Sequence, residues 1–180
     1  MNPTKEKPCA YFMTLRTYGT WLHGDDRTSV DRVRNIVNTS RIQPDKKLHH
    51  AMQTLQKQES IILNRQQGDI VLDGMTHACN KYNWRLYALH IRSNHAHVTV
   101  KSERTPEHVM TQLKAHATRF LRKQNEFPQE QKIWSRHGST KYLWQPESLY
   151  FANEYTIERQ GQKMAYIFDD ITYEEDFLCA

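Results

Sequence analysis

The stretch that decides the fold runs from residue 84 to residue 101 and reads Trp-Arg-Leu-Tyr-Ala-Leu-His-Ile-Arg-Ser-Asn-His-Ala-His-Val-Thr-Val-Lys. Its two halves, 84–91 and 95–101, are rich in aromatic and branched apolar residues, which favour extended backbone. Only Arg92-Ser93-Asn94 separates the halves. This spacing predicts two antiparallel strands joined by a short turn.

Working outward from this hairpin, helices are predicted on both sides. Apolar residues recur at helical spacing from about 64 to 82 and again from 105 to 123. The second of these helices opens with Thr105-Pro106, a capping residue followed by proline at the first helical position. A last helix is expected to open at Pro146 and to end near Gly161.

The remaining strands are expected near the beginning and in the last third of the chain. Residues 11–18 suit a first strand, and residues 133–144 read as a strand or as a hairpin with a basic, glycine-containing tip. The resulting order is strand, helix, strand, strand, helix, strand or hairpin, helix. This order is typical of an α+β domain of ferredoxin-like type, with a mainly antiparallel sheet flanked by helices.

The length of 180 residues and the 38% hydrophobic content predict one domain with its own core. We expect this domain to span residues 1–162, with a polar loop or insertion at about 24–44 and an acidic C-terminal tail at 163–180. The sequence has neither a 20-residue apolar run nor the apolar segment of a signal peptide near its beginning, so we expect a cytoplasmic protein with no membrane partner. The three cysteines lie far apart and are expected to be reduced thiols.

Charge is distributed unevenly along the chain. The formal net charge is +5, but residues 161–180 contain five carboxylates and one lysine, net −4, so residues 1–160 carry +9. A basic body suggests a polyanionic partner such as nucleic acid, although a basic helix face is also common as a plain solvated surface. The candidate DNA-binding residues lie on the 105–123 helix and at the 135–141 tip: Lys114, Arg119, Arg122, Lys123, Arg136, His137 and Lys141.

The candidate metal ligands are two histidines on the second strand of the central hairpin. His95 and His97 are two residues apart, so their rings project from the same face of a strand and can reach one ion. A pair of this kind is also found as a purely structural or surface feature. Imidazole suits divalent transition metals, so the pair would take Mn²⁺ or tolerate Mg²⁺ with a further oxygen ligand. Glu158 and Gln160, on the last helix, are both candidates for that ligand.

The candidate nucleophile is Tyr155, three residues before Glu158 on the same helix. A free phenol ionises only near pH 10. It therefore attacks a phosphodiester only where a metal ion activates the phosphorus and another group accepts the phenol proton. One of nine tyrosines, it also suits the core side of an amphipathic helix.

Three ordered blocks make the chain resemble the single-tyrosine HUH transposases of bacterial insertion sequences, including the REP-associated tyrosine transposases. They are residues 17–22 (Thr-Tyr-Gly-Thr-Trp-Leu), residues 92–98 (Arg-Ser-Asn-His-Ala-His-Val) and residues 134–139 (Trp-Ser-Arg-His-Gly-Ser), followed by Tyr155 in the last helix. The resemblance spans roughly residues 10–162.

The resemblance implies an HUH-endonuclease fold and a metal-assisted strand transferase. In it, His95 and His97 are Mg²⁺ or Mn²⁺ ligands and Tyr155 is the nucleophile, which leaves a 5′-phosphotyrosine link and a free 3′-hydroxyl. The expected partner is single-stranded DNA that forms hairpins at element ends, with Trp21, Trp134 or Trp144 as stacking surfaces for unpaired bases. Relatives include both monomers and dimers that exchange the tyrosine helix, so a homodimer is possible.

The sequence departs from the pattern of the family at the third ligand. Many members have Gln or Asn four residues after the tyrosine, where this chain has Arg159, and Gln160 follows one step later. That step rotates a side chain by about 100° on a regular helix. A distorted helix would favour Gln160 as the third ligand, and a regular helix would favour Glu158. An altered metal site would leave a DNA-binding or regulatory relative without cleavage, and a hydrolase that uses water in place of the tyrosine is a third alternative.

Overall fold

The computed structural model describes residues 7–26, 42–161 and 163–169. Part of the loop expected at 24–44, residues 27–41, lies outside this range, as do most residues of the acidic tail. The elements of the described residues are, in chain order, β1 (Ala10–Thr17), α1 (Lys46–Thr54), α2 (Arg65–Lys81), β2 (Arg85–Ile91), β3 (His95–Lys101), α3 (Pro106–Lys123), β4 (Trp134–Leu143), α4 (Pro146–Glu158) and β5 (Ala165–Phe168).

The strands form one sheet in the order β4-β1-β3-β2-β5, and every neighbouring pair is antiparallel. Strands β1 to β4 with α2 and α3 have the β-α-β-β-α-β order and the 4-1-3-2 arrangement of a ferredoxin-like domain. The predicted α+β class is therefore confirmed, as is the central hairpin of β2 and β3.

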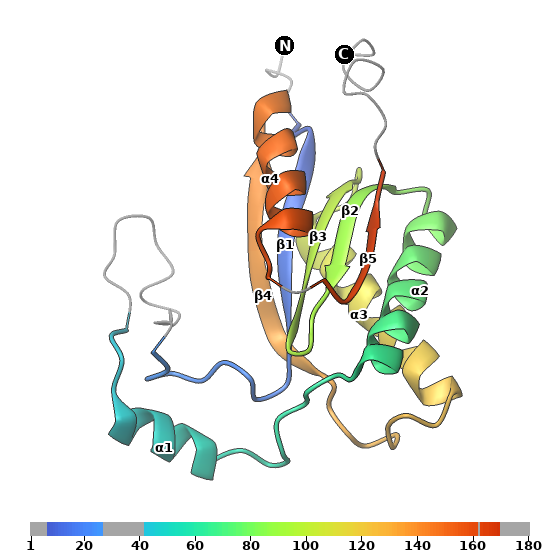
Figure 1. Cartoon of the computed structure of the whole chain (residues 1–180). Helices are drawn as coiled ribbons and strands as arrows, with labels where there is room; N and C mark the ends of the chain where they lie inside the picture. Colours follow the sequence, from blue (N-terminus) through green and yellow to red (C-terminus); the bar gives the residue numbers. More distant parts are fainter. Residues whose placement is uncertain (1–6, 27–41, 162, 170–180) are drawn as a thin grey trace, which may run out of the picture.

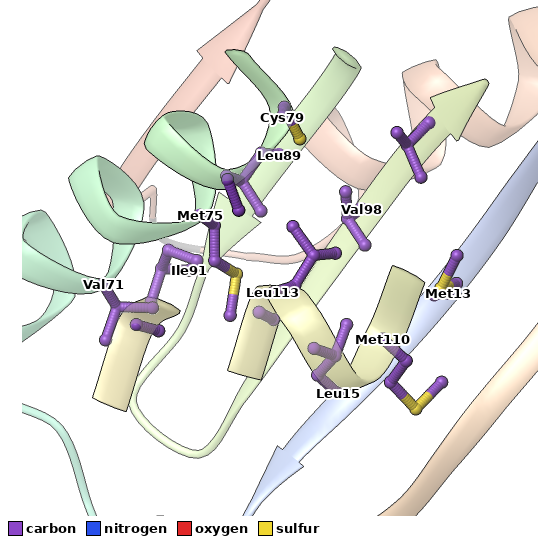
Figure 2. Packing of buried hydrophobic residues seen from close by; sticks show 14 of the residues in the cluster. Met13, Leu15, Val71, Met75, Cys79, Leu89, Ile91, Val98, Met110 and Leu113 are labelled. Atoms are coloured by element: carbon purple, nitrogen blue, oxygen red, sulfur yellow. The ribbon is translucent and has the colours of Figure 1, made fainter. Parts of the chain in front are cut away.

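Helices cover both faces of the sheet (Figure 1). α2 and α3 pack on one face, where side chains such as Met13, Leu15 and Val98 join the larger hydrophobic cluster with Met75 and Leu113 (Figure 2). α4 lies on the opposite face over a smaller cluster. Tyr155 is part of α4. Only strand side chains on the face that α4 covers can therefore contact Tyr155.

The helices α2 and α3 each begin at a capping residue. The Asn64 side chain accepts a hydrogen bond from the Gln67 backbone N–H, and the Gln67 side chain accepts one from the Asn64 backbone N–H, so a capping box starts α2. Thr105 caps α3, with Pro106 at its first position. The predicted ranges 64–82 and 105–123 thus match the structure to within about one residue.

The expected hairpin at 133–144 is not formed: this segment is the single ten-residue strand β4, which pairs with β1 along its length. Gly138 is opposite Leu15, and a Cβ at position 138 would come within 2.3 Å of the Thr14 carbonyl oxygen. The glycine is needed because two backbones approach closely, and not because the chain turns there.

Two further elements were not predicted from the sequence. α1 lies apart from the sheet (Figure 1), and all of its residues keep part of their surface exposed. β5 adds an edge strand beside β2 and lies within the segment expected to be a tail, so the sheet continues past the expected boundary at residue 162. Among the described residues, helices long and apolar enough to cross a bilayer are absent.

Candidate active site

Two histidines of β3 form the floor of the candidate site. His95 and His97 lie on the sheet face that α4 covers, whereas the side chain of Ala96, between them, is buried on the other face. His97 is opposite Thr14 on β1 and opposite His90 on β2. It is 6% exposed, and its ring centroid lies 4.8 Å from that of His95. The two imidazoles are therefore adjacent, as their spacing predicted.

Each of these imidazoles has a hydrogen-bond partner on its Nδ1 atom. Asn94 Oδ1 lies 2.6 Å from His95 Nδ1, and Thr14 Oγ1 lies 3.0 Å from His97 Nδ1. Since the amide oxygen only accepts, His95 carries its proton on Nδ1 and its Nε2 lone pair remains for a ligand bond. Partners of this kind fix the tautomer and orientation of metal-binding histidines. Neither Asn94 nor Thr14 was predicted from the sequence to have a role.

Burial keeps both rings neutral. It lowers the pKa of His97 to about 3, helped by the neighbouring His95, and it also lowers the pKa of His95. The positive charge of Arg16 lowers both values further, whereas hydrogen bonding to Gln160 raises both. The Gln160 side chain therefore lies near both imidazoles. Neutral imidazoles are the form that binds metal ions.

Tyr155 lies against this pair within the same chain. Its ring centroid is 5.5 Å from that of His97 and 5.9 Å from that of Phe12, both in edge-on geometry. The side chain is 43% exposed, so one side of the phenol ring contacts the site and the other side is exposed to solvent. Position on α4 explains the contact, because this helix covers the sheet face that carries both histidines.

The end of α4 explains how Gln160 reaches the site although it follows Tyr155 by five residues. The helix ends at Glu158, and Arg159 turns away to bond Glu154, with Nη2 at 2.8 Å from Oε1. Gln160 then folds back, its Nε2 donating to the Tyr155 carbonyl oxygen at 3.1 Å. Gly161 has φ +71°, a conformation that suits the chain reversal after a helix.

Glu158, the other candidate third ligand, has a different partner. Its Oε1 accepts from Lys163 Nζ at 2.7 Å, and its side chain is 58% exposed. The structure thus brings His95, His97, Tyr155 and Gln160 together and leaves Glu158 in an exposed ion pair.

This donor set fits a divalent ion. Clusters of three or more His, Cys, Asp or Glu side chains are absent from the described part of the chain. Two neutral imidazoles and the nearby Gln160 amide nevertheless offer nitrogen and oxygen donors that would suit Mn²⁺ and would accommodate Mg²⁺.

The predicted DNA-binding residues of α3 lie on the sheet face opposite Tyr155. Lys114, Arg119, Arg122 and Lys123 line one open depression of about 750 Å³. Lys114 Nζ donates to the carbonyl oxygens of Ser135 and His137 on β4, at 2.9 and 3.2 Å. Arg122 likewise donates to carbonyl oxygens of the loop before β4. Two of the four cations therefore also connect α3 to neighbouring backbone.

The predicted residues of the 135–141 segment lie on β4 and differ in their neighbours. Lys141 is opposite Phe12, which contacts Tyr155, and the side chain of His137 is exposed. Arg136 instead lines a pocket of about 510 Å³ with Trp21 and Trp134, two of the three tryptophans expected to stack on bases.

This pocket is connected to the histidines through Arg16. The Arg16 guanidinium lies 3.5 Å from the centre of the Trp21 ring, and Arg16 is opposite His95 in the β1–β3 register. Trp144 is elsewhere, 49% exposed and stacked on Tyr142 with ring planes 12° apart. The structure thus provides two separate aromatic surfaces.

The fold and this site together define a single-tyrosine protein of HUH type: a ferredoxin-like sheet, a histidine pair on one strand face, and a tyrosine from the C-terminal helix. Residues 46–169, more than half of the chain, match the family described as Transposase IS200 like. The chain therefore belongs to the IS200-like transposase family, whose members act in DNA transposition.

Comparison of structures gave a match of low sequence identity. A solved structure of a REP-associated tyrosine transposase bound to a REP hairpin shares 8% identity with this chain, with a TM-score of 0.49, and the match covers 85% of this chain and 67% of the other. The search of curated proteins found no match.

Proposed function

We propose that this transposase cuts and rejoins single-stranded DNA through a covalent 5′-phosphotyrosine bond to Tyr155. The observation that carries the proposal is the contact between Tyr155 and His97, whose ring centroids are 5.5 Å apart. The resemblance to HUH transposases assigns these residues to nucleophile and metal ligand. Their proximity within one chain is the arrangement that such a reaction needs.

The chemistry exchanges one phosphoester bond for another. The Tyr155 phenol oxygen attacks the phosphorus, an oxygen–phosphorus bond forms, and the bond to the 3′-oxygen of the preceding nucleotide breaks. The phenol proton is lost to solvent, and the leaving 3′-oxygen gains one. A 3′-hydroxyl from a second strand later reverses these changes, so the bond energy is conserved and ATP is not needed.

In this proposal His95, His97 and Gln160 hold Mg²⁺ or Mn²⁺. A bound divalent ion would supply Lewis-acid polarisation of a non-bridging phosphate oxygen. Asn94 and Thr14 keep the two rings oriented.

The basic and aromatic surfaces indicate where the DNA would lie. The cations of the α3 depression and the exposed residues of β4 would contact phosphates, which set position but not sequence. The pocket lined by Trp21 and Trp134 suits an unpaired base, since aromatic rings bind bases by stacking. We propose hairpin-forming single strands as the ligand, in keeping with the resemblance described above.

In this proposal one chain is sufficient for the site, with both histidines, Tyr155 and Gln160 supplied by the same molecule. Cleavage should then show no dependence of specific activity on protein concentration, and light scattering under the same conditions would report the oligomeric state. A specific activity that rises with the formation of a dimer would contradict a self-contained site.

The test of function uses labelled single-stranded hairpin DNA with Mn²⁺. Wild-type protein should give an adduct that survives denaturation by SDS, and Tyr155→Phe should abolish it. Cleavage that persists in Tyr155→Phe would instead indicate a hydrolase that uses water. Binding of the DNA with no adduct and no cleavage would indicate a regulatory relative; Arg159, on which that alternative rested, is paired with Glu154.

A further inference from the structure

A third histidine, His90, lies beside the site and was not predicted to belong to it. It lies on β2, opposite His97 of β3 and opposite Tyr166 of β5, and its side chain is completely buried. Both of its ring nitrogens are engaged: Nδ1 is 2.9 Å from the Thr156 carbonyl oxygen, and the Met164 backbone N–H donates to Nε2 at 3.2 Å.

These two partners fix the state of the ring. The Met164 N–H only donates, so Nε2 is the unprotonated nitrogen. The Thr156 carbonyl only accepts, so Nδ1 carries the proton. His90 is therefore held as one neutral tautomer, with each nitrogen bonded to backbone on a different side of the turn that follows α4.

The bond to Thr156 satisfies a carbonyl oxygen at the C-terminal end of α4. In a regular helix, the Thr156 carbonyl would accept from the amide four residues later, that of Gln160. The helix ends at Glu158, before Gln160, and the carbonyl oxygen of Thr156 is hydrogen-bonded by the His90 ring. The side chain of Gln160 then donates to the Tyr155 carbonyl oxygen, close to the two imidazoles.

The bond to Met164 holds the other side of the turn. Met164 immediately precedes β5, whose Ala165 is opposite Ile91. A single buried ring thus connects the residue that follows Tyr155 with the residue that begins the return to the sheet. Both bonds are to backbone, so they constrain the path of the chain and not merely one side chain.

We propose that His90 is a positioning residue of this active site, which fixes the end of α4 and thereby sets the Tyr155 phenol and the Gln160 amide against the histidine pair. The proposal rests on the proposed function, because it concerns the alignment of the same nucleophile. His90 acts through α4 and does not touch DNA.

Three substitutions separate the two bonds. His90→Leu removes both. His90→Asn keeps a donor at the position of Nδ1 and so retains the bond to Thr156, whereas His90→Gln reaches the position of Nε2 and retains only an acceptor for Met164. Leu121→Ala is the matched control, since Leu121 is fully buried on the opposite face of the sheet and its loss should lower stability without reaching α4.

The first measurement is the rate of adduct formation at saturating hairpin DNA, together with the dissociation constant of the DNA. His90→Leu should slow the adduct by about 100-fold, the effect of a small misplacement of a reacting group. DNA affinity should change by less than about twofold, because the aligned phenol is needed only in the transition state. His90→Asn should recover most of the rate, His90→Gln should remain slow, and Leu121→Ala should keep the wild-type rate below its melting temperature.

The second measurement does not depend on activity. 3-Fluorotyrosine placed at position 155 alone reports the ring environment by ¹⁹F NMR of the DNA-free protein. The line should move toward its value in the unfolded chain in His90→Leu, return in His90→Asn, and stay unchanged in Leu121→Ala.

These measurements separate failure of the proposal from failure of the proposed function. A wild-type protein that forms no adduct would refute cleavage, and the ¹⁹F comparison would still test His90. An unchanged ¹⁹F line in His90→Leu, or an equal loss of adduct in His90→Leu and Leu121→Ala, would overturn the positioning role.

Discussion

Replacement of Gly138 by alanine tests how β4 and the histidine site are connected. A Cβ at this position would come within 2.3 Å of the Thr14 carbonyl oxygen and within 2.9 Å of the end of the Met110 side chain. Met110 can move aside, but the Thr14 carbonyl belongs to the paired backbone of β1. The new methyl group therefore has to push β1 and β4 apart.

The size of the effect follows from that contact. In an open strand position, glycine to alanine stabilises a protein by about 0.5–1 kcal/mol. Overpacking of a tight site costs about 1–3 kcal/mol, which outweighs this gain. For a chain of this length, each kcal/mol shifts the melting temperature by about 2–4 °C. The net cost is then up to about 2.5 kcal/mol, and Gly138→Ala should melt below the wild type by up to about 10 °C.

The same displacement should reach the metal site, because Thr14 Oγ1 is bonded to His97 Nδ1. Loss of a partner that orients a ligand weakens metal binding by about 10- to 100-fold. Thermal unfolding and Mn²⁺ titration measure the two effects, with Ser139→Ala as the neighbouring exposed control. Gly138→Asn decides the reason for the glycine: a hairpin tip would tolerate asparagine better than alanine, whereas this close contact makes asparagine worse. Better tolerance of asparagine would refute the reasoning.

Three further predictions concern the proposed metal ligands, a partly buried lysine and the thiols. Gln160→Ala should weaken Mn²⁺ binding by at least about tenfold while Glu158→Ala stays near the wild type, and calorimetry showing the reverse order would assign the third ligand to Glu158. Burial lowers the pKa of Lys114 to about 8. From about pH 8 to 10 the folded state therefore binds fewer protons than the unfolded state, so the free energy of unfolding should rise with pH over this range. Urea unfolding should show this gain in the wild type relative to Lys114→Met. Burial raises the pKa of Cys79 to about 12. In a variant whose C-terminal cysteine is replaced by alanine, a thiol reagent at pH 8 should therefore label Cys9 in the native protein and Cys79 only after unfolding. Rapid labelling of Cys79 in the native protein would contradict its burial.

Local signals were sufficient for the elements that carry the site. The β2–β3 hairpin followed from two strand-like runs around a short turn, and strand alternation alone placed His95 and His97 on one face. The helices α2 and α3 followed from apolar spacing, and α3 also from its Thr105-Pro106 cap. These features depend on neighbouring residues, which a sequence displays directly.

Features set by long-range pairing could not be predicted in the same way. Gly138 resembles a turn residue locally, but its reason is a contact with the β1 backbone, so β4 was expected as a strand or hairpin. The short β5 lies at the start of an acidic segment and is recognisable only from its pairing with β2. The roles of Thr14 and His90 depend on strand register, which no local pattern specifies.

The candidate third metal ligand could not be chosen from the sequence alone. Counting along a regular helix left Gln160 and Glu158 as alternatives, because Arg159 occupies the position expected from the resemblance. The early end of α4 brings Gln160 to the imidazoles and leaves Arg159 bonded to Glu154. The meeting of Tyr155 with the histidines also came from the resemblance and not from spacing.

The most direct measurement is mass spectrometry of the adduct formed on a hairpin substrate with Mn²⁺. After nuclease and trypsin digestion, fragmentation of the peptide Tyr142–Arg159 should place a 5′-linked nucleotide on Tyr155 and leave the two other tyrosines of that peptide unmodified. A nucleotide attached to another residue, or cleaved DNA with a free 5′-phosphate and unmodified protein, would contradict the account.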